Sequence, residues 1–302
     1  MKNIIIAPDS FKGTLSASEI CEIISSTITR YIPCANIKCI PMADGGEGMT
    51  DSYIKAVGGI KTVTKATAAT GLPIKCEFGI LKDNTAVIEV ASCAGLPLMG
   101  DRPDPVKATT YGVGELINAA VSQGCEKILI GLGGSATNDL GIGMAGAIGY
   151  RFFDSYGIEL EPTAENMCKV EHISAPQNKI DADITVACDV SNPLCGPEGA
   201  TFVFGKQKGV KEEDMEKTDR AMEHFAKVIE NEFNKKIRYI PGAGAAGGLG
   251  AAMIGFLNAE LKAGADMLLD IVGYEDLLKS ADIVFTGEGR MDGQSIAGKV
   301  PV

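Results

Sequence analysis

The chain has 302 residues, of which 45% are hydrophobic and 22% are charged, a balance typical of a folded globular protein and not of a disordered one. A chain of this length usually divides its core, so two α/β lobes are expected. The net charge of −11 argues against nucleic acid or an anionic membrane as a partner, because both would be repelled.

The apolar segments and the cysteines bear on the location of the chain. The apolar run that follows Lys2 and Asn3 has only four residues, too short for the core of a signal peptide, and no stretch approaches the length needed to span a bilayer. The nine cysteines are odd in number and form no CxxC pair. They are interpreted as reduced thiols, which predicts a cytoplasmic protein without a zinc site.

The first part of the chain repeats a pattern of strand, glycine loop and helix. A strand over residues 4–7 is followed by PDSFKG and by a helical periodicity over residues 16–32. A second strand over residues 37–41 leads through ADGGEG into a helix over residues 49–57. Both units are typical of a parallel sheet.

Beyond Gly59 the pattern changes to alternating segments with a turn at residues 70–73, which favours antiparallel hairpins. Further strands and helices are then predicted in chain order. The strands are 85–90, 127–131 and 184–188, and the helices are 105–123 and 211–231. Residues 243–259, rich in Gly and Ala, predict a helix packed closely against a sheet.

Residues 281–287 restore the pattern of a strand that enters a glycine loop. Because this pattern occurs at both ends of the chain, we expect one lobe to be built from both ends and the other to be inserted between them.

Five loops combine glycines with polar residues after an apolar strand: PDSFKG, ADGGEG, GLGGSATNDLG, CDVSNPLCG and TGEGRMDGQSIAGK. In open α/β sheets ligands bind beyond the carboxyl ends of the strands. The five loops are therefore expected to meet in one site.

The third loop is a candidate phosphate site. The backbone of Gly133 and Gly134 and the hydroxyls of Ser135 and Thr137 could hold phosphate oxygens; a tight turn before a glycine-rich helix is the equal alternative. The loop matches neither GxxxxGK[ST] nor GxGxxG.

Carboxylates in two other loops could bind a metal ion. Asp44 and Glu47 flank two glycines and suit Mg²⁺, although acidic residues at a helix start have the same pattern. Asp189, with Asn192, could hold a metal or orient a hydroxyl, and an Asx-turn before Pro193 is the alternative.

Lys12, Arg290 and Lys299 are cations within these loops, where phosphoryl transfer would need positive charge; each could also be an ordinary surface cation. His172 and His224 are the only histidines in the sequence. A carboxylate is therefore expected as the general base.

Together, APDSFKGTLSA, PMADGGEGMTD, GLGGSATNDLGIGMA, ACDVSNPLCGPEGA and FTGEGRMDGQSIAGKVPV resemble, in order and along the whole chain, the bacterial type I glycerate kinase family. The resemblance implies ATP-dependent phosphorylation of D-glycerate to 2-phosphoglycerate, with Mg²⁺ as cofactor. It also implies an α/β fold with a flavodoxin-like (Rossmann-like) lobe of residues 1–64 and 276–302 and an inserted mixed α/β lobe of residues 65–275.

On this resemblance, Lys12 and Arg290 are expected to bind the glycerate carboxylate or the transferring phosphoryl group, and Asp189 is the first candidate for the base. The remaining roles are substrate binding and nucleotide binding. The substrate-binding set is Asp9, Ser10, Asp44, Glu47, Asn192 and Asp292, with Asp44 and Glu47 also the candidate metal ligands. The nucleotide-binding set is Gly133, Gly134, Ser135, Thr137, Gly287 and Gly289.

Several alternatives stay open at this point. The chain could phosphorylate the 3-hydroxyl or another small hydroxy acid, and it could form a homodimer. Family members typically continue for some tens of residues past GKVPV, whereas this chain stops at Val302, so the first lobe is expected to lack sheet neighbours. A non-catalytic anion-binding protein is the alternative that this difference favours.

Overall fold

The computed structural model describes residues 2–11, 14–43, 45–100 and 104–289. Its first elements follow the predicted strand, loop and helix units: β1 (Asn3–Pro8), α1 (Ala17–Tyr31), β2 (Asn36–Cys39) and α2 (Met49–Val57). Helix α1 begins where it does because Ser16 and Glu19 form a capping box: each side chain accepts a hydrogen bond from the backbone N–H of the other.

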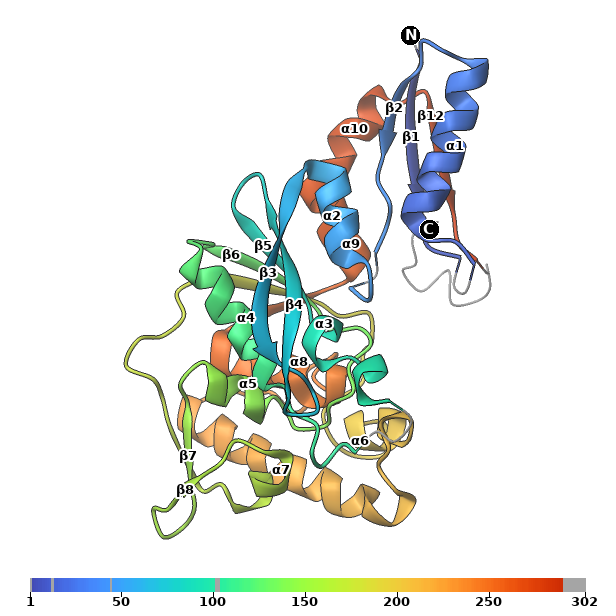
Figure 1. Cartoon of the computed structure of the whole chain (residues 1–302). Helices are drawn as coiled ribbons and strands as arrows, with labels where there is room; N and C mark the ends of the chain where they lie inside the picture. Colours follow the sequence, from blue (N-terminus) through green and yellow to red (C-terminus); the bar gives the residue numbers. More distant parts are fainter. Residues whose placement is uncertain (1, 12–13, 44, 101–103, 290–302) are drawn as a thin grey trace.

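The two ends of the chain share a three-stranded parallel sheet. Strand β12 (Ile283–Gly287) pairs with β1, with Ile4 opposite Ile283 and Pro8 opposite Gly287, and the sheet order is β12-β1-β2. Figure 1 shows these strands together, with α1 beside them. The prediction of one sheet from both chain ends is confirmed.

A second, six-stranded sheet of order β11-β10-β6-β5-β4-β3 lies between these ends in the sequence. Its strands are β3 (Gly59–Thr67), β4 (Pro73–Leu81), β5 (Thr85–Glu89), β6 (Lys127–Gly131), β10 (Asp183–Ala187) and β11 (Glu260–Lys262). The β3-β4 and β4-β5 pairs are antiparallel, which confirms the predicted hairpins, and the β5-β6-β10-β11 part is parallel. The inserted part is therefore a mixed α/β structure.

The remaining helices lie around the two sheets, with α10 beside the terminal sheet, and a small three-stranded sheet lies at the periphery of the inserted part (Figure 1). The helices are α3 (Ala91–Ala94), α4 (Tyr111–Ser122), α5 (Ile142–Ala147), α6 (Ala200–Phe204), α7 (Met215–Phe233), α8 (Ala245–Leu257), α9 (Gly264–Val272) and α10 (Tyr274–Ser280). The small sheet has β7 (Arg151–Phe153), β8 (Glu159–Leu160) and β9 (His172–Ser174). Short 3-10 helices are η1 (Leu96–Met99), η2 (Ala164–Lys169), η3 (Lys206–Lys208) and η4 (Glu212–Asp214).

Two of the predicted helices start later than expected. Helix α4 begins at Tyr111 and not at residue 105, because the amide of Thr110 is held by the side chain of Asp139. Helix α7 begins at Met215 after the 3-10 turn η4, where three consecutive acidic residues precede the helix.

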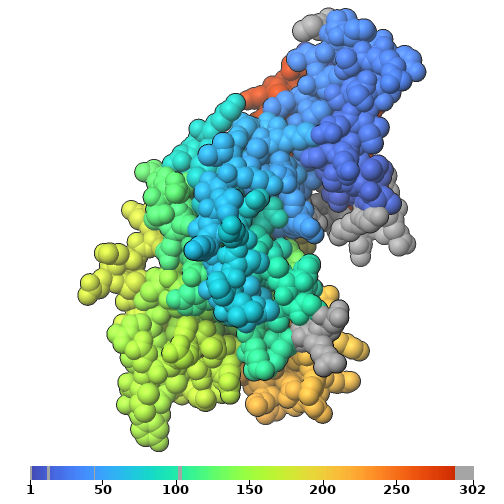
Figure 2. Space-filling model, in the orientation of Figure 1, coloured from blue at the N-terminus to red at the C-terminus, as the bar shows by residue number. Residues whose placement is uncertain are grey.

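A hydrophobic cluster joins the terminal sheet to the inserted sheet. It combines residues of β1, α2, three strands of the inserted sheet, and α9: Ala7, Met49, Tyr53, Val87, Leu129, Ala187, Met267 and Leu268. Figure 2 shows the unit of β1, β2 and α1 projecting from the larger body. The cluster holds the loops of the two sheets next to each other.

Strand β12 is at the edge of the terminal sheet within the part of the chain that the structure describes. Its Ile283, Val284 and Phe285 each expose between 38% and 40% of their surface. None of the helices in the described ranges is long and apolar enough to cross a membrane. The predicted boundary between residues 64 and 65 falls inside β3, and the division into domains stays a prediction.

Candidate active site

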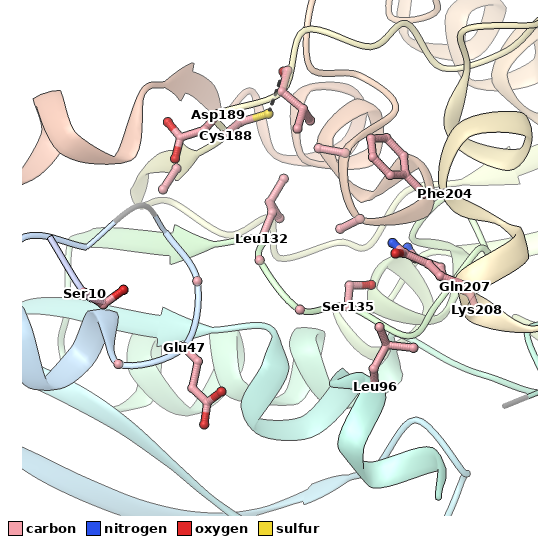
Figure 3. Close-up of a pocket in the computed structure, with 18 of the residues that line it drawn as sticks. Ser10, Glu47, Leu96, Leu132, Ser135, Cys188, Asp189, Phe204, Gln207 and Lys208 are labelled. Carbon is pink, nitrogen blue, oxygen red and sulfur yellow. Dashed lines mark hydrogen bonds between the residues drawn. The ribbon is translucent and has the colours of Figure 1, made fainter. Parts of the chain in front are cut away.

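A cavity of about 810 Å³ lies beyond the carboxyl ends of β6 and β10. Figure 3 shows Leu132 at its centre, with Ser10 and Glu47 on one side and Ser135, Gln207 and Lys208 on the other. Four of the five predicted loops contribute lining residues within the described ranges, and the fifth begins next to Ser10. The predicted convergence at strand ends is therefore observed for four of the five loops.

The glycines of ADGGEG and GLGGSATNDLG are needed for contact between the two loops. The N–H of Gly133 donates to the carbonyl oxygen of Gly45 at 3.0 Å. A Cβ on Gly131 would lie 2.4 Å from that oxygen, and one on Gly133 would lie 2.5 Å from the Cα of Gly46. For Gly133 and Gly134 the sequence favoured a phosphate site or a tight turn equally, and packing of the two loops is a further reason for a glycine at positions 131 and 133.

Ser135 and Thr137 form a hydroxyl pair in this loop. The Oγ of Ser135 lies 2.9 Å from the Oγ1 of Thr137 and also accepts the N–H of Thr137. Ser135 lines the cavity, whereas Thr137 is fully buried and is not among the lining residues. Ser135 is therefore the hydroxyl that can reach a ligand, and Thr137 orients it.

Asp139, in the same loop, is fully buried. Its Oδ2 accepts the N–H and Oγ1–H of Thr110, and its Oδ1 accepts the N–H of Gly141. Burial raises the pKa of this carboxyl above its usual value, and the hydrogen bonds oppose that shift. Asp139 joins the glycine loop to the start of α4 and was not among the predicted site residues.

Lys208 is a second residue that the sequence analysis missed. It lines the cavity with an exposed fraction of 3%, and its Nζ donates to the carbonyl oxygen of Thr137 at 2.7 Å. Burial lowers the pKa of Lys208 to about 7, and the charge of Asp139 partly offsets the shift. The sequence signal that could have indicated Lys208 is the stretch GKQKG after an apolar run. Glycines on both sides of a lysine allow its side chain to lie close to packed backbone.

Asp9, Ser10 and Gly287 lie together at the ends of β1 and β12. The N–H of Asp9 donates to the carbonyl oxygen of Gly287 at 2.8 Å, and Oδ1 of Asp9 accepts the N–H of Ser10 at 2.6 Å. Of the three, Ser10 lines the cavity. Gly289 is exposed and does not line it.

Asp189 and Glu47 both line the cavity, and Figure 3 shows their carboxylates pointing in different directions. Oδ1 of Asp189 accepts the N–H of Gly264, the first residue of α9, at 2.9 Å. Asp189 thus caps a helix in addition to facing the cavity. Glu47 is exposed.

Glu89, at the end of β5, caps the start of α2. This role of Glu89 was not predicted from the sequence. Its carboxylate accepts the N–H groups of Gly48 at 3.1 Å and Thr50 at 2.7 Å. The predicted alternative was that Asp44 and Glu47 cap this helix. Glu47 accepts neither of these two N–H groups, and Asp44 lies outside the described residues.

Asn192 is not among the residues that line the cavity. Its side-chain Nδ2 donates to the carbonyl oxygen of Glu198 at 2.8 Å, and its own carbonyl oxygen accepts the N–H of Gly244. The amide therefore closes the loop that follows β10.

Four of the predicted site residues lie outside the described residues: Lys12, Asp44, Arg290 and Asp292. Lys299, the third predicted loop cation, lies outside them as well. Within the described ranges, no group of three or more His, Cys, Asp or Glu side chains could hold a metal ion.

Comparison with known proteins gives a consistent result. Residues 4–302 match the model of the glycerate kinase family. The chain is 43% identical to a Bacillus subtilis protein named glycerate kinase, over 99% of this chain and 80% of that protein. It is 41% identical to an Escherichia coli protein named glycerate 2-kinase, with 99% of this chain and 80% of that protein covered.

A solved structure from Salmonella typhimurium, described as a glycerate kinase 2, superposes with a TM-score of 0.93 at 39% identity. The match covers 100% of this chain and 82% of that one. The order of the five loops, the convergence of four of them on one cavity and these similarities agree: this chain belongs to the glycerate kinase family.

Proposed function

We propose that this chain transfers the γ-phosphoryl group of ATP to D-glycerate and releases ADP and 2-phosphoglycerate. The observation that carries the proposal is the cavity in which the loops of two sheets meet, in a chain of the glycerate kinase family. The name glycerate 2-kinase of the Escherichia coli relative supports phosphorylation of the 2-hydroxyl. In this reaction the hydroxyl oxygen bonds to the γ-phosphorus while the bond from that phosphorus to the bridging oxygen breaks.

Asp189 is proposed as the base that receives the hydroxyl proton. It lines the cavity, and its bond to Gly264 fixes the side chain, which supports a positioned acceptor. Ser10 is proposed to contact glycerate together with Asp9 and Asp292.

The glycerate carboxylate and the nucleotide phosphates need cations in the site, since the chain as a whole is acidic. Lys12 and Arg290 are proposed for the glycerate carboxylate or the transferring phosphoryl group. Gly133, Gly134 and Ser135, with Gly287 and Gly289, are proposed for the nucleotide phosphates. Thr137 supports this set through its contact with Ser135.

Mg²⁺ is proposed to bind on the side of the cavity that Glu47 lines, because this ion commonly takes one or two protein carboxylates together with substrate phosphates. Glu47, which is exposed beside the cavity, and Asp44 would hold it. When bound, the ion would neutralise charge on the nucleotide phosphates.

The lobes are proposed to be a flavodoxin-like unit of residues 1–64 and 276–302 and an inserted unit of residues 65–275. The parallel pairing of β1 with both β2 and β12 supports the first unit. A cytoplasmic location and a homodimer stay predictions.

A coupled assay that measures ADP formation with D-glycerate tests the proposal. We expect turnover that depends on both substrates, and NMR of the product should show the phosphate on the 2-oxygen. A phosphate on the 3-oxygen, or faster turnover with another hydroxy acid, would replace the substrate assignment. Binding of D-glycerate by calorimetry without any turnover would favour the non-catalytic protein.

A further inference from the structure

The segment that contains α6 and η3 is attached to the glycine loop at two points. The side-chain Nδ2 of Asn138 donates to Oγ1 of Thr201 at 3.0 Å, and Nζ of Lys208 donates to the carbonyl oxygen of Thr137 at 2.7 Å. Both bonds are buried. The segment therefore fixes the ammonium group of Lys208 beside the loop that contains Ser135.

The environment of Lys208 does not balance its charge. Asp139 is the charged group that influences it, yet no carboxylate within the described residues lies within 4.0 Å of Nζ. Both oxygens of Asp139 accept hydrogen bonds from Thr110 and Gly141. Burial of an ammonium group without a direct ion pair destabilises the folded chain. A purely structural role therefore does not explain a lysine at this position.

A second buried group in this region lacks a partner. Oδ1 of Asn138 has no hydrogen-bond donor within the described part of the chain, although the residue is 1% exposed. Buried polar atoms are normally paired, and exceptions often mark a site that a ligand or water completes. Asn138 neighbours Thr137, the acceptor of the Lys208 bond.

We propose that Lys208 binds the phosphate chain of the nucleotide, together with Ser135 and the backbone of Gly133 and Gly134. The phosphate class is favoured because Lys208 lies on the same side of Leu132 as Ser135, whereas Ser10 lies on the other side (Figure 3). An anion that enters the cavity there would supply the charge that the protein does not. This assignment rests on the proposed kinase function for its ligand, but its test does not require turnover.

The test measures binding of AMP-PNP, an ATP analogue that is not hydrolysed, by calorimetry without glycerate. Lys208→Met should weaken AMP-PNP binding by roughly 10-fold to 100-fold, the loss expected for one charge-assisted hydrogen bond. Lys206→Met is the matched control, because Lys206 is exposed in the same turn η3. D-Glycerate binding should be unchanged in both variants.

Proton uptake gives a second readout that needs no variant. The ionisable side chains that line the cavity with Lys208 in the described ranges are Glu47, Cys188 and Asp189. Asp139 does not line the cavity, but its charge acts on Lys208. Titrations of wild-type protein at pH 8 in buffers of different ionisation enthalpy should show uptake of about one proton per AMP-PNP, because a bound phosphate favours the charged lysine. Lys208→Met should abolish this uptake.

Two results would overturn the assignment. One is unchanged AMP-PNP affinity in a folded Lys208→Met variant, and the other is an absence of proton uptake in the wild type. Weaker binding of D-glycerate by Lys208→Met, with normal AMP-PNP binding, would show that Lys208 contacts glycerate and would also contradict the proposal. Failure of the glycerate assay would refute the proposed function and leave these nucleotide measurements intact.

Discussion

The N–H of Gly133 donates a 3.0 Å hydrogen bond to the carbonyl oxygen of Gly45, and this bond joins the loop after β6 to the loop before α2. The two loops come from segments that are about ninety residues apart in the sequence. Since both line the cavity, their contact sets the shape of the candidate active site.

Gly133→Ala should disturb this contact. Its Cβ would lie 2.5 Å from the Cα of Gly46, a backbone atom that cannot move aside easily, so we expect a loss of roughly 1–3 kcal/mol in the free energy of unfolding. Urea denaturation measures the loss. Gly287→Ala is the control for stability, because its Cβ would meet nothing within 4 Å. Equal stability of the two variants would contradict the packing argument.

Asp189→Asn should lower kcat by about 100-fold or more with the fold intact, since the amide cannot accept the proton at neutral pH. The side-chain oxygen of Asn can still accept the N–H of Gly264, so the cap of α9 is kept. Steady-state kinetics with D-glycerate measures the loss. Asp219→Asn, which alters a carboxylate that accepts the N–H of Gly196 and does not line the cavity, should retain activity. Near-normal turnover of Asp189→Asn would remove Asp189 from the role of base.

Glu89→Gln should weaken the start of α2, because the charge that faces the helix dipole and the N–H groups of Gly48 and Thr50 is lost. The expected cost is about 1 kcal/mol in the free energy of unfolding. Glu77→Gln serves as the comparison, since Glu77 is 55% exposed and 3.7 Å from Lys61, and should change stability by less than about 0.5 kcal/mol. If chemical denaturation gives the same value for both variants, the capping role is wrong.

The stability of Lys208→Met relative to wild type should depend on pH. The pKa of Lys208 is about 7 in the folded chain against 10.5 for an ordinary lysine, so the unfolded chain binds more protons between these values. The cost of burying the charge is fully present below pH 7 and falls as the pH rises towards 10.5.

Methionine has no such cost, so the stability advantage of the variant should be largest below pH 7. Above that pH the advantage should shrink by at most about 1.4 kcal/mol per pH unit. Urea unfolding of both proteins at pH 6, 7, 8 and 9 measures this. An advantage that stays constant across this range would show that Lys208 is not destabilised by burial.

Local sequence was enough to predict much of the fold. The strand at β1, the helix after Ser16 and the hairpin of β3 and β4 were predicted from periodicity and a turn, which act between neighbouring residues. The return of the strand and glycine loop at residues 281–287 also indicated the shared sheet, because both chain ends carry the same pattern.

The candidate site was predictable only to the level of its loops. The glycines and hydroxyls of GLGGSATNDLG were visible in the sequence, and so was their position after a strand. The sequence by itself therefore determined the family, the order of the elements and the loops that meet at the cavity.

Tertiary structure alone decided what individual side chains do. Glu89 caps a helix about forty residues away in the sequence, and Lys208 becomes a cavity residue only because α6 and η3 pack against the glycine loop. Asn192, which the resemblance suggested for the substrate, also donates a hydrogen bond to Glu198 in its own loop, a contact that the motif did not indicate. Burial and hydrogen bonding are properties of contacts between distant segments, and a single residue's neighbours in the sequence do not specify them.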